Sequence, residues 1–165
     1  MNHLSKSFGA IMDTYNREYF NVMIIISIMF IIYSAFKYIN IPLTNSVLPH
    51  ALIKTGVHPK QAGDYVIFTL EHPYLPHVKD KLTKRIGCIE GQRIERINQH
   101  FYCNGQLIAI ALERDIQGAI LPVFSFTGII PAGKAFLVGD TPNSFDSRYW
   151  GLFDIQKTEK LIPII

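Results

Sequence analysis

The chain has 165 residues, of which 48% are hydrophobic, and its mean hydropathy is +0.18. This length accommodates one modest domain plus an appendage, and the hydropathy is high for a wholly soluble protein. The net charge is only +3, and the 16 basic residues are spread along the chain rather than gathered in one stripe. A mild, dispersed charge argues against a nucleic-acid-binding protein.

The excess of apolar residues lies near the N-terminus. Residues 19–36 contain no charged side chain, and as a helix they would extend about 27 Å, close to the roughly 30 Å of a bilayer core. Lys37 can reach the membrane interface, while Tyr38 and Ile39 extend the apolar surface. We therefore expect three parts, namely a short N-terminal segment at 1–18, one transmembrane anchor at 19–39 and a separate body at 40–165.

A cleavable signal peptide and a buried core helix are the alternatives to a retained anchor. A signal peptide usually has a shorter apolar region and a cleavage site with small residues, whereas residues 34–37 are followed by the bulky Tyr38 and Ile39. A retained anchor is therefore favoured. Charge does not settle its orientation, because two basic residues lie near each end of the segment: Lys6 and Arg17 before it, Lys37 and Lys54 after it.

Beyond Asn40 the pattern changes to short runs of β-branched and aromatic residues separated by turn residues, which is typical of strands. Asn104-Gly105 is the strongest hairpin signal. With no amphipathic helix of ten residues between these runs, the sequence predicts a mainly β protein, in which an antiparallel folded-sheet or barrel-like body follows one transmembrane helix. The predicted strands are 65–70, 93–97, 100–102, 106–110 and 134–138.

Two cysteines, Cys88 and Cys103, permit one disulfide but are too few for a zinc site. Either a disulfide or two free thiols is compatible with the sequence, because the register of the two residues cannot be read from it. The sequence also lacks an HExxH helix, a Walker loop and a GxGxxG turn, so no metal or nucleotide site is predicted.

Serine becomes a strong nucleophile only when a neighbouring base takes its proton. The histidines form no convincing Ser-His-Asp arrangement, and we interpret them as solvated polar residues: His3, His50, His58, His72, His77 and His100. Lys84 is a better candidate base, because we expect it at the start of a strand in an apolar setting, ahead of Ile86 and Ile89, and burial disfavours a charged lysine. The alternatives are a solvated Lys84-Arg85 pair on a sheet edge and, for Ser46, a simple turn serine ahead of a proline.

Residues 139–151 combine turn formers with acids, serines, an arginine and aromatic residues, which predicts an ordered loop rather than a plain connector. Asp146 and Arg148 are placed to form a charge-assisted pair that fixes the loop. This would leave Ser144 to contact another group.

The loop resembles the last signature segment of type I signal peptidases, Gly-Asp-Asn-x-x-Asn-Ser-x-Asp-Ser-Arg-Tyr-x-Gly. It is one residue shorter and has Thr-Pro after Gly-Asp, which is more similar to the conjugative-transfer (TraF-type) branch. Three further segments resemble family segments in the expected order: 41–49 the Ser-Met-x-Pro segment, 63–66 the Gly-Asp-x-Val segment, and 83–94 the Lys-Arg-x-x-Gly-x-x-Gly-Asp segment. The chain departs from them at Val47, His50, Glu90 and Gln92, where the family usually has Met, Thr, Pro and Asp.

The resemblance implies a role for each matching residue. Ser46 would be the nucleophile and Lys84 the general base, with Thr44 and the main chain of Ser46 stabilising the oxyanion and Ser144 orienting the lysine amine. Three further residues would structure the loop: Asp140, Asp146 and Arg148. The family needs no metal or other cofactor.

The resemblance also implies the activity of a membrane-bound serine endopeptidase that removes signal sequences from exported precursors. The expected location is the bacterial inner membrane, crossed once, with the catalytic domain on the extracytoplasmic side. The expected partners are membrane lipid and a precursor, here a pilin precursor in conjugative transfer. Hydrolysis and cyclisation of its product are both compatible with the resemblance. The alternatives are a general housekeeping signal peptidase, a non-catalytic envelope or pilus assembly protein of the same fold, and a soluble self-cleaving repressor, which the anchor disfavours.

Overall fold

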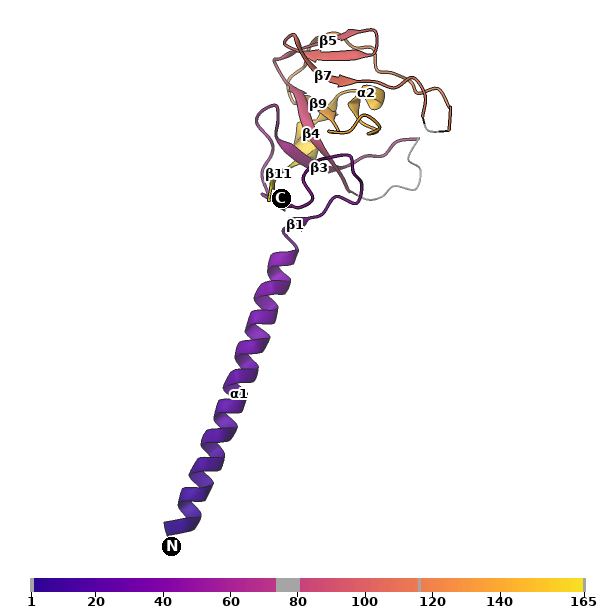
Figure 1. The fold of residues 1–165 in the computed structure, drawn as a ribbon. Coiled ribbons are helices and arrows are strands. Elements are labelled where there is room, and N and C mark those ends of the chain that lie inside the picture. The colour runs from indigo at the N-terminus through magenta and orange to yellow at the C-terminus, as the bar shows by residue number, and fades with distance from the viewer. Residues whose placement is uncertain (1, 74–80, 116, 165) are drawn as a thin grey trace. The chain divides into compact units, whose positions relative to one another are not determined.

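The computed structural model describes residues 2–73, 81–115 and 117–164, with side chains from residue 17 onwards. The chain divides into two compact units, residues 1–39 and 40–165, which are described separately (Figure 1).

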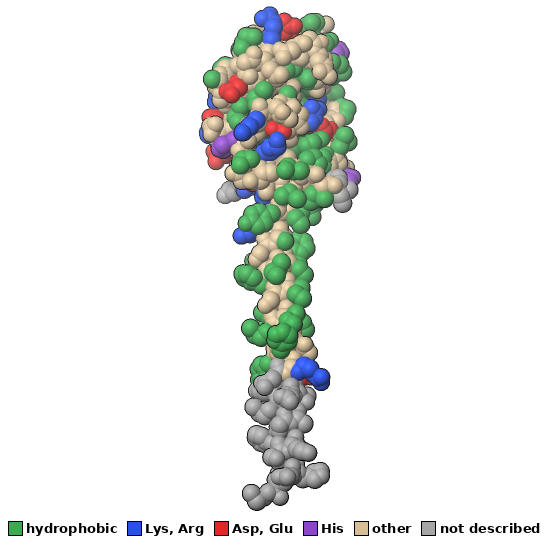
Figure 2. Space-filling model, turned by 90° about the vertical axis from the view of Figure 1, so that its left-hand side faces the viewer, with side chains coloured by type: hydrophobic (Ala, Val, Ile, Leu, Met, Phe, Trp, Pro, Cys, Tyr) green, Lys and Arg blue, Asp and Glu red, His purple; other side chains and the backbone are tan. Residues whose placement is uncertain are grey.

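The first unit consists of one long helix, α1 (Asn2–Phe36). Its stretch Arg17–Phe36 contains 20 residues with a mean hydropathy of 2.1, so it is long and apolar enough to cross a membrane. Large apolar side chains are exposed along the described part of the helix (Figure 2). The predicted apolar helix is therefore confirmed, although it begins well before residue 19.

The second unit is built from antiparallel strands, as the sequence predicted. In the described residues, one seven-stranded sheet has the order β1-β2-β11-β3-β4-β9-β10, and a four-stranded sheet has the order β7-β6-β5-β8. The larger sheet comprises β1 (Ile39–Asn40), β2 (Leu52–Lys54), β3 (Tyr65–Thr69), β4 (Lys81–Ile89), β9 (Lys134–Val138), β10 (Phe153–Asp154) and β11 (Glu159–Pro163). The smaller sheet comprises β5 (Arg93–Ile97), β6 (His100–Cys103), β7 (Gln106–Ile110) and β8 (Gly128–Ile129).

The hairpin between β6 and β7 forms at the predicted turn. Asn104 and Gly105 have φ angles of 50° and 82°, and positive φ at both central residues is what a tight hairpin turn of this kind requires. Strand β4 differs from the expectation, because it begins at Lys81 rather than near residue 84. Lys84 therefore lies inside the strand.

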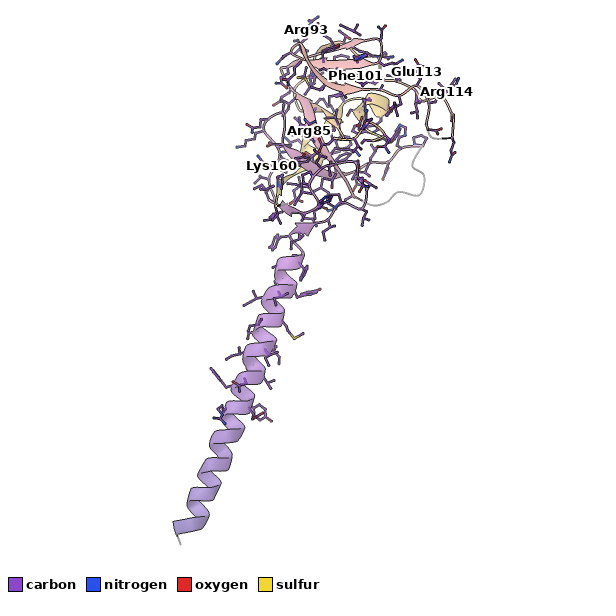
Figure 3. All side chains as sticks on the ribbon, in the orientation of Figure 1. Arg85, Arg93, Phe101, Glu113, Arg114 and Lys160 are labelled. Carbon is purple, nitrogen blue, oxygen red and sulfur yellow. A yellow bond between two sulfur atoms is a disulfide. The ribbon has the colours of Figure 1, made fainter. Side chains whose placement is uncertain are left out.

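Two apolar clusters form most of the core. One cluster contains residues from both sheets, including Phe101 of β6 and Phe136 of β9, whose rings stack with centroids 5.0 Å apart. The other covers the opposite face of the larger sheet and includes Ile86 and Leu137. Figure 3 labels Phe101 and Arg93 in the smaller sheet and Arg85 in the larger one.

A disulfide joins the two sheets. It links Cys88 on β4 to Cys103 at the end of β6, and both residues belong to the cluster between the sheets. This resolves the choice between a disulfide and two free thiols, which the sequence left open.

Two short helical turns complete the body. Helix α2 (Ser147–Trp150) follows β9, and the 3-10 helix η1 (Ile155–Lys157) precedes β11. Since α2 is capped by Asp146, whose carboxylate accepts a hydrogen bond from the main chain of Arg148, the sequence between β9 and α2 is held as an ordered loop.

Candidate active site

A cavity of about 550 Å3 lies on the strand body. Its walls come from three segments that are distant in the sequence: residues 40–46, residues 81–84 of β4, and the loop residues 141 and 143–145. Four of the predicted site residues line this one cavity: Thr44, Ser46, Lys84 and Ser144. The fold thus brings together side chains that are up to about 100 residues apart in the sequence.

Ser46 lies in the loop between β1 and β2 and is half-buried. Its Oγ is 2.6 Å from Oγ1 of Thr44, and either hydroxyl can be the donor. A hydroxyl of Thr44 at this distance can therefore hold Ser46 Oγ, and it can also donate to a negative oxygen that forms beside it.

Lys84 is only 3% exposed although it is a lysine. It shares a face of β4 with Ile86, which is completely buried in the core. The pKa of Lys84 is lowered from 10.5 to about 8, chiefly by burial and in the same direction by the charge of Arg148, against the opposing charges of Asp146 and Asp140. No ion pair to Lys84 exists among the described residues, and desolvation makes the neutral amine easier to reach than in a solvated lysine.

Ser144 carries a hydroxyl that is buried and has no hydrogen-bond partner within the described part of the chain. Such a group is costly unless a partner is available. Lys84 is the amine that lines the same cavity. An unpaired hydroxyl and an unpaired amine in one cavity have complementary hydrogen-bonding capacities.

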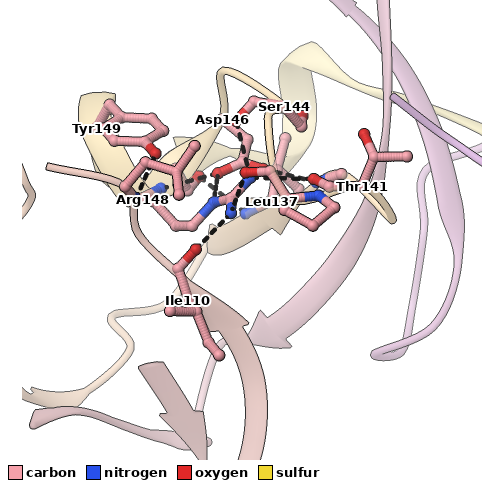
Figure 4. Close-up of polar contacts among 11 residues, drawn as sticks. Ile110, Leu137, Thr141, Ser144, Asp146, Arg148 and Tyr149 are labelled. Carbon is pink, nitrogen blue, oxygen red and sulfur yellow. Dashed lines mark hydrogen bonds and ion pairs between the residues drawn. The ribbon is translucent and has the colours of Figure 1, made fainter. Parts of the chain in front are cut away.

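The loop that carries Ser144 is fixed by the buried ion pair of Asp146 and Arg148 (Figure 4). Nε and Nη2 of Arg148 each donate to the carboxylate at 2.7 Å, which is a two-point contact. Both side chains are at most 2% exposed. Arg148 also donates to main-chain carbonyl oxygens, those of Ile110, Thr141, Pro142 and Ser144.

Asp140, at the start of the same loop, contacts the segment that carries Ser46. Its main-chain N–H donates to the carbonyl oxygen of Ser46 at 2.7 Å. Its carboxylate accepts from the N–H of Leu48 at 3.0 Å, from the hydroxyl of Tyr65 at 2.8 Å and from Nε of Arg85 at 2.7 Å. The sequence did not indicate Tyr65 as part of this group, because its contact with Asp140 joins residues that are 75 positions apart.

Histidines do not line the cavity in the part of the chain that the structure describes. His50 and His58 are exposed, and Nδ1 of His58 contacts the carbonyl oxygen of Thr158. His100 stacks on Tyr102 in the smaller sheet, and His72 lies edge-on to Phe145. The side chains of His3 and His77 lie outside the described residues. The described residues also contain no cluster of histidine, cysteine and acidic side chains that could hold a metal ion.

The chain combines an N-terminal apolar helix with a body of antiparallel strands that holds a serine hydroxyl and a buried lysine in one cavity. These features suit a serine peptidase that acts at a membrane. A comparison with protein families gives the particular family. The family model described as signal peptidase, peptidase S26, matches residues 17–161. The chain therefore belongs to the S26 signal peptidases, a family of serine peptidases that act on precursors bearing signal sequences.

Among solved structures, the chain is similar to a signal peptidase I from Enterococcus faecalis V583. The two chains are 22% identical, the match covers 64% of this chain and 98% of the other, and the TM-score is 0.42. No curated protein sequence matches the chain significantly.

Proposed function

We propose that the protein is a membrane-anchored serine endopeptidase that removes signal sequences with Ser46 as nucleophile and Lys84 as general base. One observation carries this proposal. Lys84 is buried, has its pKa lowered to about 8, and lines the same cavity as the hydroxyl of Ser46. A lysine with a pKa near 8 is partly neutral close to physiological pH, and its neutral form can accept the proton that a serine must lose before it attacks.

The reaction follows as acyl transfer. Lys84 Nζ takes the proton from Ser46 Oγ, which attacks the carbonyl carbon of the scissile peptide bond. The tetrahedral intermediate collapses when the C–N bond breaks, and the leaving amine receives the proton from Lys84. Lys84 then takes a proton from water as the water oxygen attacks the ester carbon, the C–O bond to Ser46 breaks, and Lys84 returns the proton to Ser46 Oγ.

The remaining residues support this reaction in ways that their contacts favour. The hydroxyl of Thr44 donates to the oxyanion, because Thr44 Oγ1 already lies 2.6 Å from Ser46 Oγ. The N–H of Ser46 is the second donor. Ser144 accepts a hydrogen bond from the Lys84 amine and directs its lone pair towards Ser46. Asp140, Asp146 and Arg148 hold the loop that presents Ser144.

The proposed location is the bacterial inner membrane, crossed once, with the body on the extracytoplasmic side. Ser46 follows Phe36, the last residue of α1, by ten residues. A connection of this length spans at most about 35 Å, so it would keep the nucleophile near the membrane surface on the side where the body lies. The disulfide between Cys88 and Cys103 favours the same side, because disulfides form and persist in oxidising compartments. To test for the disulfide, free thiols are alkylated in intact cells, and the protein is then reduced and alkylated with a second reagent. We expect both cysteines to carry the second reagent, which mass spectrometry detects. Two free thiols in the native protein would contradict it.

For the substrate we propose a pilin precursor in conjugative transfer, with small side chains before the cleaved bond. The Thr141-Pro142 variant of the last segment and the compact body support this branch over a housekeeping signal peptidase. The acyl group would pass either to water or to an amine of the substrate itself. Transfer to water would give a linear product, and transfer to the amine would give a cyclic one. Location of the gene among conjugation genes would support the assignment, and location among general secretion genes would contradict it.

The catalytic proposal is tested by processing of a precursor in membranes that contain Ser46→Ala or Lys84→Ala. We expect cleavage to be abolished while the amount of protein in the membrane is unchanged. Ser125→Ala and Lys157→Ala are matched controls, since both residues lie outside the cavity and are exposed. Normal processing by either active-site variant would reject the dyad and would favour an envelope protein that only binds its partners.

A further inference from the structure

Tyr65 lies beside the catalytic strand but outside the set of residues used above. It is the first residue of β3, and its Cα pairs with that of Arg85 on β4, next to Lys84. Arg85 in turn pairs with Val138, the last residue of β9, from which the chain continues into Gly139 and Asp140. Three adjacent strands therefore place Tyr65 and Arg85 close to the start of the loop that follows β9.

The side chains of Tyr65 and Arg85 both donate hydrogen bonds to the carboxylate of Asp140. The hydroxyl of Tyr65 donates to Oδ2 at 2.8 Å, and Nε of Arg85 donates to Oδ1 at 2.7 Å. The carboxylate is only 6% exposed, so these donors replace the water that would otherwise solvate it. Each oxygen is thus held by a different neighbouring strand.

The oxygen that Tyr65 holds is also the one that contacts the nucleophile segment. Oδ2 of Asp140 accepts from the N–H of Leu48 at 3.0 Å, and the N–H of Asp140 donates to the carbonyl oxygen of Ser46 at 2.7 Å. A rotation of the Asp140 carboxylate would therefore move the main chain two residues after Ser46. Position matters here, because a displacement of about 1 Å at a reacting group can cost roughly a hundredfold in rate.

The hydroxyl of Tyr65 remains a donor at all pH values at which the peptidase would work. Burial, and then its hydrogen bond to Asp140 and the negative charge there, raises the pKa of Tyr65 to about 12. Arg85 acts in the opposite direction but does not cancel the effect. The hydroxyl therefore stays protonated, and so able to donate to Asp140, at these pH values.

We propose that Tyr65 is a positioning residue for catalysis: its hydroxyl fixes the carboxylate of Asp140, which fixes the segment from Ser46 to Leu48. The proposal rests on the proposed function, since it assumes that Ser46 is the nucleophile. It assigns a role to the third position of the segment Gly63-Asp64-Tyr65-Val66, which the family resemblance leaves undefined.

The test is Tyr65→Phe in the full-length protein, purified in detergent and assayed with a peptide that has alanine one and three residues before the cleaved bond. We expect kcat to fall about tenfold and KM to change less than about twofold, because the contact aligns the nucleophile and does not bind substrate. Tyr102→Phe removes the same atom from the smaller sheet, away from the cavity, and should leave both constants unchanged.

Hydrogen exchange provides a local readout that does not depend on activity. In Tyr65→Phe the amide of Leu48 should exchange faster, because its acceptor is no longer held. The amide of Leu137, which donates to Oγ of Ser147, should exchange as in the original protein. Unchanged exchange at Leu48, or a loss of rate that is fully explained by a lower folded fraction, would overturn the proposal.

Ser46→Ala separates the two levels of the argument. If it is inactive while Tyr65→Phe has the original kcat, only the role of Tyr65 is rejected. If Ser46→Ala still cleaves the peptide, the proposed nucleophile is wrong and the role of Tyr65 falls with it.

Discussion

Gly139 lies directly against Ser144, and a Cβ atom at position 139 would overlap both Cβ and Oγ of that serine. The same Cβ would come within 2.7 Å of the carbonyl oxygen of Ser46. A side chain at position 139 would not fit, because the segment of Ser46 and the loop with Ser144 approach each other there. The main-chain bond from Asp140 to Ser46 joins the two segments at the same place.

Gly139→Ala should for this reason separate the two halves of the site. Neither a main-chain oxygen nor a short buried serine can move aside easily, so we expect kcat/KM to fall by about a hundredfold or more. Gly118→Ala serves as the control, because its added Cβ would meet no atom within 4 Å and only local backbone strain is introduced. Peptide cleavage measures both. Full activity of Gly139→Ala would show that the observed packing is not needed for catalysis.

Ser144→Ala and Ser147→Ala should have opposite consequences, although both serines are buried in the same loop region. The hydroxyl of Ser144 has no partner within the described residues, so its removal should not lower the free energy of unfolding by more than about 0.5 kcal/mol. If it orients Lys84, kcat should fall at least about tenfold.

The hydroxyl of Ser147 accepts a hydrogen bond from the N–H of Leu137 and does not line the cavity. Ser147→Ala should therefore lower the free energy of unfolding by about 1–3 kcal/mol, because a buried N–H loses its acceptor. Denaturant unfolding and peptide cleavage separate the two effects. An active Ser144→Ala variant would remove the orienting role.

Features that depend on neighbouring residues were predictable from the sequence. The turn at Asn104-Gly105 needs only two residues that tolerate positive φ, and the runs at 93–97 and 134–138 show their strand character locally. The start of β4 was missed because Lys81 interrupts the apolar pattern before Lys84.

Features that depend on tertiary contacts were not predictable. The pairing of Cys88 with Cys103 requires two sheets to pack face to face. The low pKa of Lys84 depends on how deeply the fold buries it, and the charges of Asp146 and Arg148 reach it from a segment about 60 residues away. A motif can suggest that this lysine is a base, but only the fold provides the burial that lowers its pKa towards the value that a base needs.

Removing one partner of the Asp146–Arg148 pair should strongly destabilise the body. Arg148→Met would leave the buried carboxylate of Asp146 without its two-point partner, and four main-chain oxygens would lose a donor. We expect the free energy of unfolding to fall by about 3–5 kcal/mol. Glu95→Gln in the exposed Arg93–Glu95 pair is the control and should cost no more than about 1 kcal/mol. Similar losses for the two variants would mean that the buried pair contributes no more than an exposed one.

The rate of cleavage should rise with pH, with a midpoint near the pKa of Lys84. The base must be neutral, and burial lowers the pKa of Lys84 to about 8, so kcat/KM should increase about tenfold per pH unit below this value and level off above it. Lys84→Arg cannot become neutral in this range and should be inactive at every pH. A rate that is constant from pH 6 to pH 9 would exclude Lys84 as the titrating base.

The same burial should make the folded state more stable as the pH rises. The pKa of Lys84 is about 8 in the folded protein and 10.5 as its ordinary value, so between these values the unfolded chain binds more protons than the folded one. The free energy of unfolding should therefore increase with pH above about 8. Tyr65, whose pKa is raised from 10.0 to about 12, has the opposite effect above pH 10, so the measurement belongs between pH 7.5 and 9.5. Lys84→Met should abolish the increase, whereas Lys157→Met, at an exposed position, should preserve it. An equal slope in both variants would show that the amine of Lys84 is not desolvated.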